Sequence, residues 1–164
     1  MHKVGPPARA YSAAGQTLPA GGPVNTPIAL DTISYDPAGA VDTTHYFGGT
    51  AANLTSARAW SGGTIANAFI VPAAGFYRCE WNVTATATAA GQRLAGGVWV
   101  NANTTSASSG GNIHSGAALI LGVGASDIVE CAQGDYIQLF AYSNAALVMV
   151  SVSGYNFLTV QQVA

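Results

Sequence analysis

Charge is what this sequence has least of. Asp, Glu, Lys and Arg make up 7% of the 164 residues, against about 25% in an ordinary soluble domain. Lys3 is the only lysine and the net charge is -2, so the chain has no basic stripe that could neutralise phosphates. Nucleic acid is therefore not an expected partner.

Long hydrophobic runs are also missing. No segment approaches the roughly 18 apolar residues of a membrane-spanning helix, and residues 1–15 lack the apolar centre of a signal peptide. We therefore expect no membrane span, and we expect the chain to be made and assembled in a cytoplasm.

The low charge accompanies a high apolar content, because hydrophobic residues make up 49% of the chain. A lone monomer with so few charges has little protection against association. One interpretation is that other subunits cover much of the exterior. The alternative is a neutral but polar surface rich in Gly, Ala and Thr.

Groups that could carry catalysis are scarce. The three histidines have no motif partner, and the GASDI sequence around Ser126 does not match the GxSxG nucleophile elbow. No run of Asp and Asn has the density of a calcium-binding loop. The sequence predicts no catalytic residue, no metal and no cofactor.

The most informative segment that is present is VPAAGFYRCEWNV, residues 71–83. Its side chains alternate with the period of two that is typical of a strand lining a core. The predicted core face holds Tyr77, Cys79, Trp81 and Val83, and the opposite face holds Arg78, Glu80 and Asn82.

Gly and Pro punctuate the rest of the chain at short intervals, and helical periodicity is absent. Short segments between such turn signals indicate an all-β sandwich. Residues 27–35 change face midway, which predicts a bulge or a corner. Further strands of a sandwich with about eight to ten strands are expected at 94–100, 119–123, 135–142 and 147–158.

Five motifs in order give the chain a family resemblance: ARAYSAA, NTPIALDTISYDP, the AG-Y element at 74–77, CAQGDYIQLFAY and SGYNFLTV. In this order they resemble the globular head of complement component q and the wider tumour-necrosis-factor-like jelly rolls, from about Arg9 to Val160. The resemblance implies a two-sheet antiparallel jelly-roll sandwich that forms homotrimers. We expect an N-terminal arm at 1–8 and one domain at 9–164.

The two cysteines both fall at alternating core positions. Cys79 lies between Tyr77 and Trp81, and Cys131 lies two residues after Val129. The resemblance places their strands side by side, so a disulfide is conceivable. A reducing compartment favours buried free thiols instead.

The resemblance also implies an interface. In the family, the face opposite the core on the AG-Y strand looks along a threefold axis, and here that face carries Arg78, Glu80 and Asn82. Glu130 on the neighbouring strand joins them, and Val150 with Val152 extends the contact toward one end. The alternative is that these are ordinary solvent-facing groups.

A second contact surface is expected on the strand after Gly134. Ile137 and Leu139 fill the core there, whereas Tyr136, Phe140 and Tyr142 face outward with Gln138. Exposed aromatic residues on one face invite a contact, as does Trp60 in a predicted loop. The contact is with a neighbouring virion protein, a host-surface glycan or the loops of the chain itself.

These observations favour a non-enzymatic structural protein of a bacteriophage virion. It would be a trimeric capsid decoration, head-fibre knob or tail-tip module, contacting other capsid or tail proteins. The consecutive prolines Pro6 and Pro7 keep the arm extended, which makes the arm the expected attachment in a decoration protein. The alternative is an extracellular ligand- or receptor-binding trimer of the complement-head or cytokine type.

Overall fold

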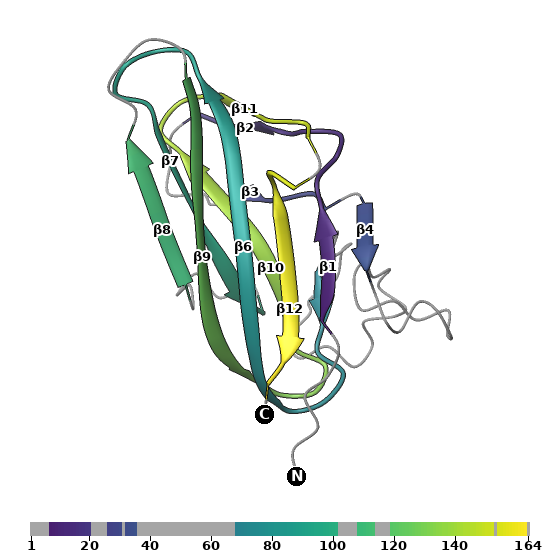
Figure 1. The fold of residues 1–164 in the computed structure, drawn as a ribbon. Helices are drawn as coiled ribbons and strands as arrows, with labels where there is room; N and C mark the ends of the chain where they lie inside the picture. Colours follow the sequence, from purple (N-terminus) through teal and green to yellow (C-terminus); the bar gives the residue numbers. More distant parts are fainter. Residues whose placement is uncertain are drawn as a thin grey trace.

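The computed structural model describes residues 7–20, 26–30, 32–35, 68–101, 108–113, 119–152 and 154–163. These residues form two packed β-sheets and no helix (Figure 1). The strands are β1 (Ala8–Tyr11), β2 (Thr17–Leu18), β3 (Thr26–Pro27), β4 (Thr32–Tyr35), β5 (Phe69–Ile70), β6 (Gly75–Ala87), β7 (Arg93–Val100), β8 (Ser108–Ile113), β9 (Leu119–Cys131), β10 (Tyr136–Ser143), β11 (Leu147–Met149) and β12 (Phe157–Gln162).

All strand pairs among the described residues are antiparallel. The seven-stranded sheet has the order β2-β11-β6-β12-β1-β4, with β9 on the other side of β6. The five-stranded sheet has the order β3-β10-β7-β8, with β5 also paired to β10. The predicted all-β, two-sheet antiparallel jelly roll is confirmed.

The core lies between the sheets, where the inward side chains of long strands meet. β6 and β9 pair along their whole length, from Gly75 opposite Cys131 to Ala87 opposite Leu119. Their strict alternation sends every second side chain into the core. Every predicted core residue is buried: Tyr77, Cys79, Trp81, Val83, Cys131, Ile137 and Leu139.

The predicted corner in residues 27–35 is confirmed. β3 pairs with β10 in the five-stranded sheet, whereas β4 pairs with β1 in the seven-stranded sheet. The chain therefore crosses from one sheet to the other between Pro27 and Thr32. Ile28 and Leu30, which lie in the crossing, are buried.

Two predicted strand boundaries and the predicted number of strands differ from the structure. The strand expected at 119–123 continues to Cys131, because β6 pairs with it throughout. The segment expected at 147–158 divides into β11 and β12, both of which pair with β6. The described strands number more than eight to ten because three of them are only two residues long.

The N-terminal region is described from Pro7 onward, and β1 begins at Ala8. The last residue of the predicted arm therefore belongs to a strand, and residues 1–6 lie outside the described part. In the described part of the chain, no helix has the length and hydropathy needed to cross a membrane.

Candidate interaction face on the seven-stranded sheet

The seven-stranded sheet presents one side to the core and the other, here called the outer face, to the surroundings. In the alternation of β6 and β9, the even-numbered residues point outward. β12 continues this face, because Thr159 pairs with Glu80 and Gln161 with Arg78. The residues of the outer face discussed below are Phe76, Arg78, Glu80, Asn82, Ile120, Ile128, Glu130, Thr159 and Gln161.

Arg78 and Glu80 lie on successive outward positions of β6, as predicted, and both are exposed. With the rest of the described chain, neither side chain forms an ion pair or a hydrogen bond. β6 lies inside the sheet, between β9 on one side and β11 and β12 on the other. A cation and an anion without a partner in the described chain therefore stand one strand in from the β9 edge of the sheet, with paired strands on both sides.

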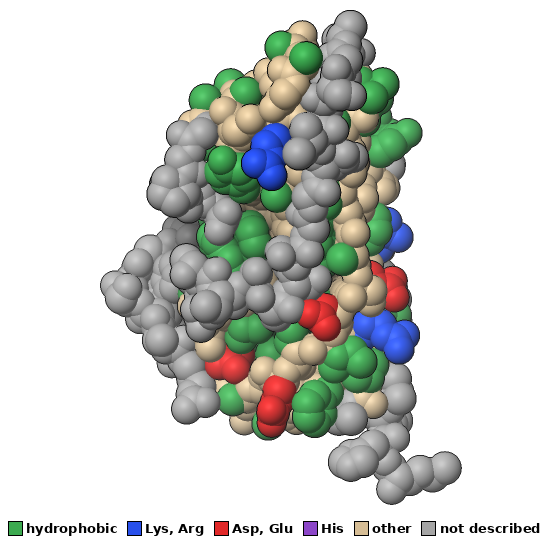
Figure 2. Space-filling view, turned by 90° about the vertical axis from the view of Figure 1, so that its left-hand side faces the viewer, with side chains coloured by type: hydrophobic (Ala, Val, Ile, Leu, Met, Phe, Trp, Pro, Cys, Tyr) green, Lys and Arg blue, Asp and Glu red, His purple; other side chains and the backbone are tan. Residues whose placement is uncertain are grey.

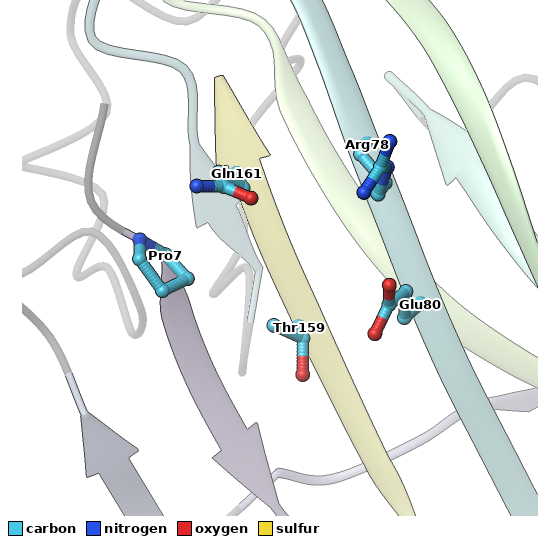
Figure 3. A pocket seen from close by; sticks show the side chains of 5 residues that line it. All are labelled: Pro7, Arg78, Glu80, Thr159 and Gln161. Carbon is cyan, nitrogen blue, oxygen red and sulfur yellow. The ribbon is translucent and has the colours of Figure 1, made fainter. Parts of the chain in front are cut away.

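These two charges line a shallow groove of about 250 Å³ together with Thr159, Gln161 and Pro7. Figure 3 shows Arg78 and Glu80 on β6 beside Gln161 and Thr159 on β12, with Pro7 at the beginning of β1. The other three lining groups are uncharged, so Arg78 and Glu80 are the charged groups among the residues that line the groove.

Apolar side chains flank the charged pair. Ile128 lies directly opposite Arg78 on β9 and is 53% exposed. Phe76, opposite Glu130, is 46% exposed. Large apolar groups left this open on a sheet face cost free energy in water, by roughly 25 cal/mol for each Å² of apolar surface.

The other end of the outer face is apolar. Ile120 and Val148 flank Thr86 on its two sides, and they are 54% and 60% exposed. Val152 and Tyr155, from the loop between β11 and β12, are also exposed. We call these four large residues, Ile120, Val148, Val152 and Tyr155, the apolar end.

Low charge is visible on the surface itself. Figure 2 views the molecule from the left-hand side of Figure 1, and its described surface is mostly hydrophobic and neutral polar, with a few charged groups. Glu80 and Glu130 are the only glutamates of the chain, and both are exposed on the outer face.

Asn82, the third predicted interface residue of β6, is already engaged within the chain. Its amide nitrogen donates to the hydroxyl of Thr84 at 2.9 Å and to the carbonyl of Tyr155. The Thr84 hydroxyl also donates to the Tyr155 carbonyl, at 3.1 Å. Asn82 therefore holds the β11–β12 loop over the sheet.

The predicted interface residues Val150 and Val152 do not lie on a strand. Both belong to the β11–β12 loop, where Val150 donates its backbone N–H to the Thr84 carbonyl at 3.0 Å. Val150 is half-buried and Val152 is 47% exposed. Val152 therefore belongs to the apolar end, whereas Val150 mainly anchors the loop.

The aromatic side chains of β10 do not form an open contact surface, and of the three expected contacts their burial agrees with the one made by the chain itself. Tyr136 and Phe140 are 2% and 5% exposed, and Tyr142 is half-buried. Phe140 stacks on Trp99 of β7, with ring centroids 4.4 Å apart. Trp99 lies opposite Gln138, two residues before Phe140 on β10, so the two rings are diagonal neighbours on one face. Burial also raises the pKa of Tyr136.

Alternation did place these β10 side chains on the side away from the core, but it could not tell that this side is covered. Tyr136 and Phe140 are unavailable to a partner in this conformation. Trp60, the other predicted contact, lies outside the described residues. Within the described chain, the exposed aromatic residues are Phe76 and Tyr155.

The cysteines are free thiols, and the strand register explains why. Cys79 lies opposite Asp127, whereas Cys131 lies opposite Gly75. The offset along β6 is four residues, or roughly 13 Å, and a disulfide needs Cα atoms within about 7 Å. Burial raises the pKa of both thiols to about 12, so neither is a reactive thiolate.

The Gly-Asp motif has a structural role in the turn before β10. The carboxylate of Asp135 is buried and accepts hydrogen bonds from the Asn101 amide at 2.8 Å and the Ala132 N–H at 2.7 Å. The Asn101 side chain in turn accepts from the Tyr136 N–H at 3.1 Å. Asp135 therefore joins the ends of β7, β9 and β10.

Sequence reasoning missed Ile120, Ile128, Phe76 and Val148 as members of the outer face. A signal was present in the alternation: Phe76 is an even-numbered residue like Arg78 and so points to the same side of β6, and Ile128 precedes the inward Val129. The sequence analysis underestimated the length of β9, and it is this length that joins the two ends of the outer face into one continuous surface. The described residues contain no group of three His, Cys, Asp or Glu side chains that could hold a metal ion.

No protein-family model matches the chain, and no curated protein matches it in sequence. Its structure is similar to that of Eiger TNF from S. frugiperda, with a TM-score of 0.65, covering 99% of this chain and 94% of that chain. The chain has the TNF-like jelly-roll fold. At 9% sequence identity, the similarity concerns the TNF-like fold alone.

Proposed function

We propose that this TNF-like chain is a non-enzymatic binding module that assembles as a homotrimer through its outer face. The observation that carries the proposal is the distribution of exposed large hydrophobic side chains. Among residues with described side chains, all of them lie on strands of the seven-stranded sheet or in the loop joining two of those strands: Phe76, Leu119, Ile120, Ile128, Val148, Val152 and Tyr155.

The five-stranded sheet offers no comparable patch among its described side chains, since Trp99 and Phe140 are buried. Among the described side chains, the large exposed apolar groups therefore belong to the seven-stranded sheet and the loop between β11 and β12. Clustered exposed apolar groups of this kind mark interaction sites, and the 7% charge content gives the chain few means of staying monomeric. The TNF-like fold and the family resemblance support three subunits.

A non-enzymatic role is supported by the state of the candidate nucleophiles. Both thiols are buried and protonated, with pKa values of about 12. Ser126 lies in the middle of β9, flanked along the strand by Ala125 and Asp127, and a flat strand lacks the sharp turn that exposes a nucleophile.

The oligomeric state tests the first part of the proposal. Native mass spectrometry at micromolar concentration should give three subunits. Ile120→Glu, which places a charge in the apolar end, should give monomers. Ala90→Glu, which adds the same charge in the exposed β6–β7 turn, should leave the trimer intact. A monomeric native chain, or an Ile120→Glu trimer, would overturn the proposal.

We further propose that the trimer is a structural component of a bacteriophage virion, as a capsid decoration, head-fibre knob or tail-tip module. The stability of such a particle protein would come from covered surface, which agrees with the open outer face and the low charge. Virions purified on a density gradient should contain the chain, and deleting residues 1–6 should release it from particles while the trimer stays folded.

The second candidate is an extracellular ligand- or receptor-binding trimer, favoured by the similarity to Eiger TNF. Purified virions and purified trimers distinguish the two candidate functions. Absence of the chain from virions, together with saturable binding of labelled trimers to cells, would favour the extracellular role. Trimers on virions that also bind host cells would indicate a tail-tip module.

A further inference from the structure

The unpaired charges Arg78 and Glu80 carry an inference about which partner the outer face accepts. Both side chains are exposed, and neither has an ion pair or side-chain hydrogen bond with the described chain. Yet they lie between β9 and β12, next to Ile128, rather than at an edge open to water. A partner that covers Ile128 and Phe76 therefore covers these charges as well.

Covering the charges has a physical consequence. A buried charge without a partner of opposite sign is strongly unfavourable. A molecule that covers both side chains as they stand needs an anion at Arg78 and a cation at Glu80, at the spacing of two outward residues on one strand. The groove around them supplies only the neutral groups of Thr159, Gln161 and Pro7.

A second copy of the chain meets this requirement, since it carries the same two charges at the same spacing. We infer that Arg78 of each subunit pairs with Glu80 of the next, so that each of the three interfaces contains one such ion pair. This inference rests on the proposed trimer. In a closed ring of identical head-to-tail contacts, each Arg78 meets one Glu80 of a neighbouring subunit, and neither of these two residues is left without a partner.

The pairing would determine specificity more than affinity, because apolar contact supplies the attraction and charges reject wrong partners. A foreign apolar surface without this pair of charges would leave Arg78 and Glu80 desolvated and unpaired. The chain could therefore keep a large exposed apolar face and still select its own copies.

Charge reversal tests the inference. Arg78→Glu and Glu80→Arg should each raise the midpoint concentration for trimer dissociation by roughly a hundredfold. Because this midpoint varies as the square root of the trimer dissociation constant, the shift corresponds to about 5.5 kcal/mol per trimer. The double variant Arg78→Glu/Glu80→Arg should recover the native midpoint, since the pair is reversed but kept. Circular dichroism should show that all three variants remain folded, because both positions are exposed.

A matched variant controls for charge alone. Arg93→Glu reverses an exposed arginine on β7, in the other sheet. It should leave the midpoint within a few fold of the native value.

The outcomes separate this inference from the proposed function. If the native chain is a trimer and the single charge-reversal variants dissociate at the native midpoint concentration, the inference is wrong and the proposed trimer stands. A double variant as weak as the single variants would also overturn it, because the two charges would then meet something other than each other. A native monomer would overturn the proposed function itself.

Discussion

Asn156 accepts a hydrogen bond from the backbone N–H of Thr84, 72 residues earlier in the chain, with a distance of 2.6 Å to its Oδ1 atom. β6 pairs with β11 at Ala85 and with β12 up to Asn82. The Asn156 side chain takes the place of a strand between these two pairings.

The same side chain also secures the loop that it belongs to. Its Nδ2 atom donates to the Val150 carbonyl at 2.6 Å, and its backbone carbonyl accepts from the Ser12 N–H at 2.9 Å. Asn156 has no exposed surface. It thus connects β6, the β11–β12 loop and the end of β1, and it supports the loop that carries Val152 and Tyr155.

Asn156→Ala should destabilise the fold, because it leaves the Thr84 N–H and the Val150 carbonyl without partners. An unsatisfied buried group costs about 1–3 kcal/mol, so the variant should lose at least that much in urea unfolding. Asn144→Ala is the control, since its bonds to Arg93 and Gly91 are exposed and water can replace them. Equal losses for the two variants would contradict this account.

Asp135→Asn should also destabilise the fold, although it changes only one atom. The carboxylate accepts from two donors, the Asn101 amide and the Ala132 N–H. An amide offers one acceptor and one donor, so one of these bonds is lost, at a cost of about 1–3 kcal/mol. Asp127→Asn should be nearly neutral, because Asp127 accepts only from the Ile128 N–H. Thermal unfolding of both variants checks this difference.

Gly96→Ala should weaken the core. A Cβ atom at Gly96 would lie 2.9 Å from the Trp81 ring and 3.2 Å from the Phe140 carbonyl oxygen, and overpacking of this kind costs about 1–3 kcal/mol. At Gly122 a Cβ would meet only the Thr84 hydroxyl, at 3.8 Å. Gly122→Ala should therefore be tolerated in denaturant unfolding, and a loss as large as that of Gly96→Ala would argue against the close packing of Trp81.

The two thiols should not react with a thiol reagent in the folded protein. A thiol reagent at pH 8 should label neither Cys79 nor Cys131, because both are buried with pKa values of about 12. Both should react after unfolding in denaturant. Rapid labelling of the native protein would show that the core between β6 and β9 opens readily.

The same pKa values predict a loss of stability at high pH. Folding raises the pKa of the two thiols from 9.0 to about 12, so above pH 9 the unfolded chain binds fewer protons than the folded chain. The free energy of unfolding contributed by the thiols therefore falls as pH rises from about 9 toward 12. Replacing both cysteines with Ala should flatten this part of the stability curve, and an unchanged slope would contradict the prediction.

Local pattern was enough to predict much of the fold. Alternation in residues 71–83 separated Tyr77 and Trp81 from Arg78 and Glu80, because side chains on a strand point to opposite faces regardless of what surrounds them. The change of face in residues 27–35 predicted the crossing between sheets for the same reason. The Gly-Asp pair at Gly134 marked the turn into β10.

The sequence by itself determined which side chains share a face, and only the tertiary structure decided which faces are covered. β10 and β6 have similar alternation, yet Phe140 is buried against Trp99 while Phe76 is exposed beside Glu130. Trp99 contributes to this difference, because it lies far from Phe140 in the sequence and stacks on its ring in the folded chain. The bond from Thr84 to Asn156 has the same origin, because a partner 72 residues away leaves no trace in a local pattern.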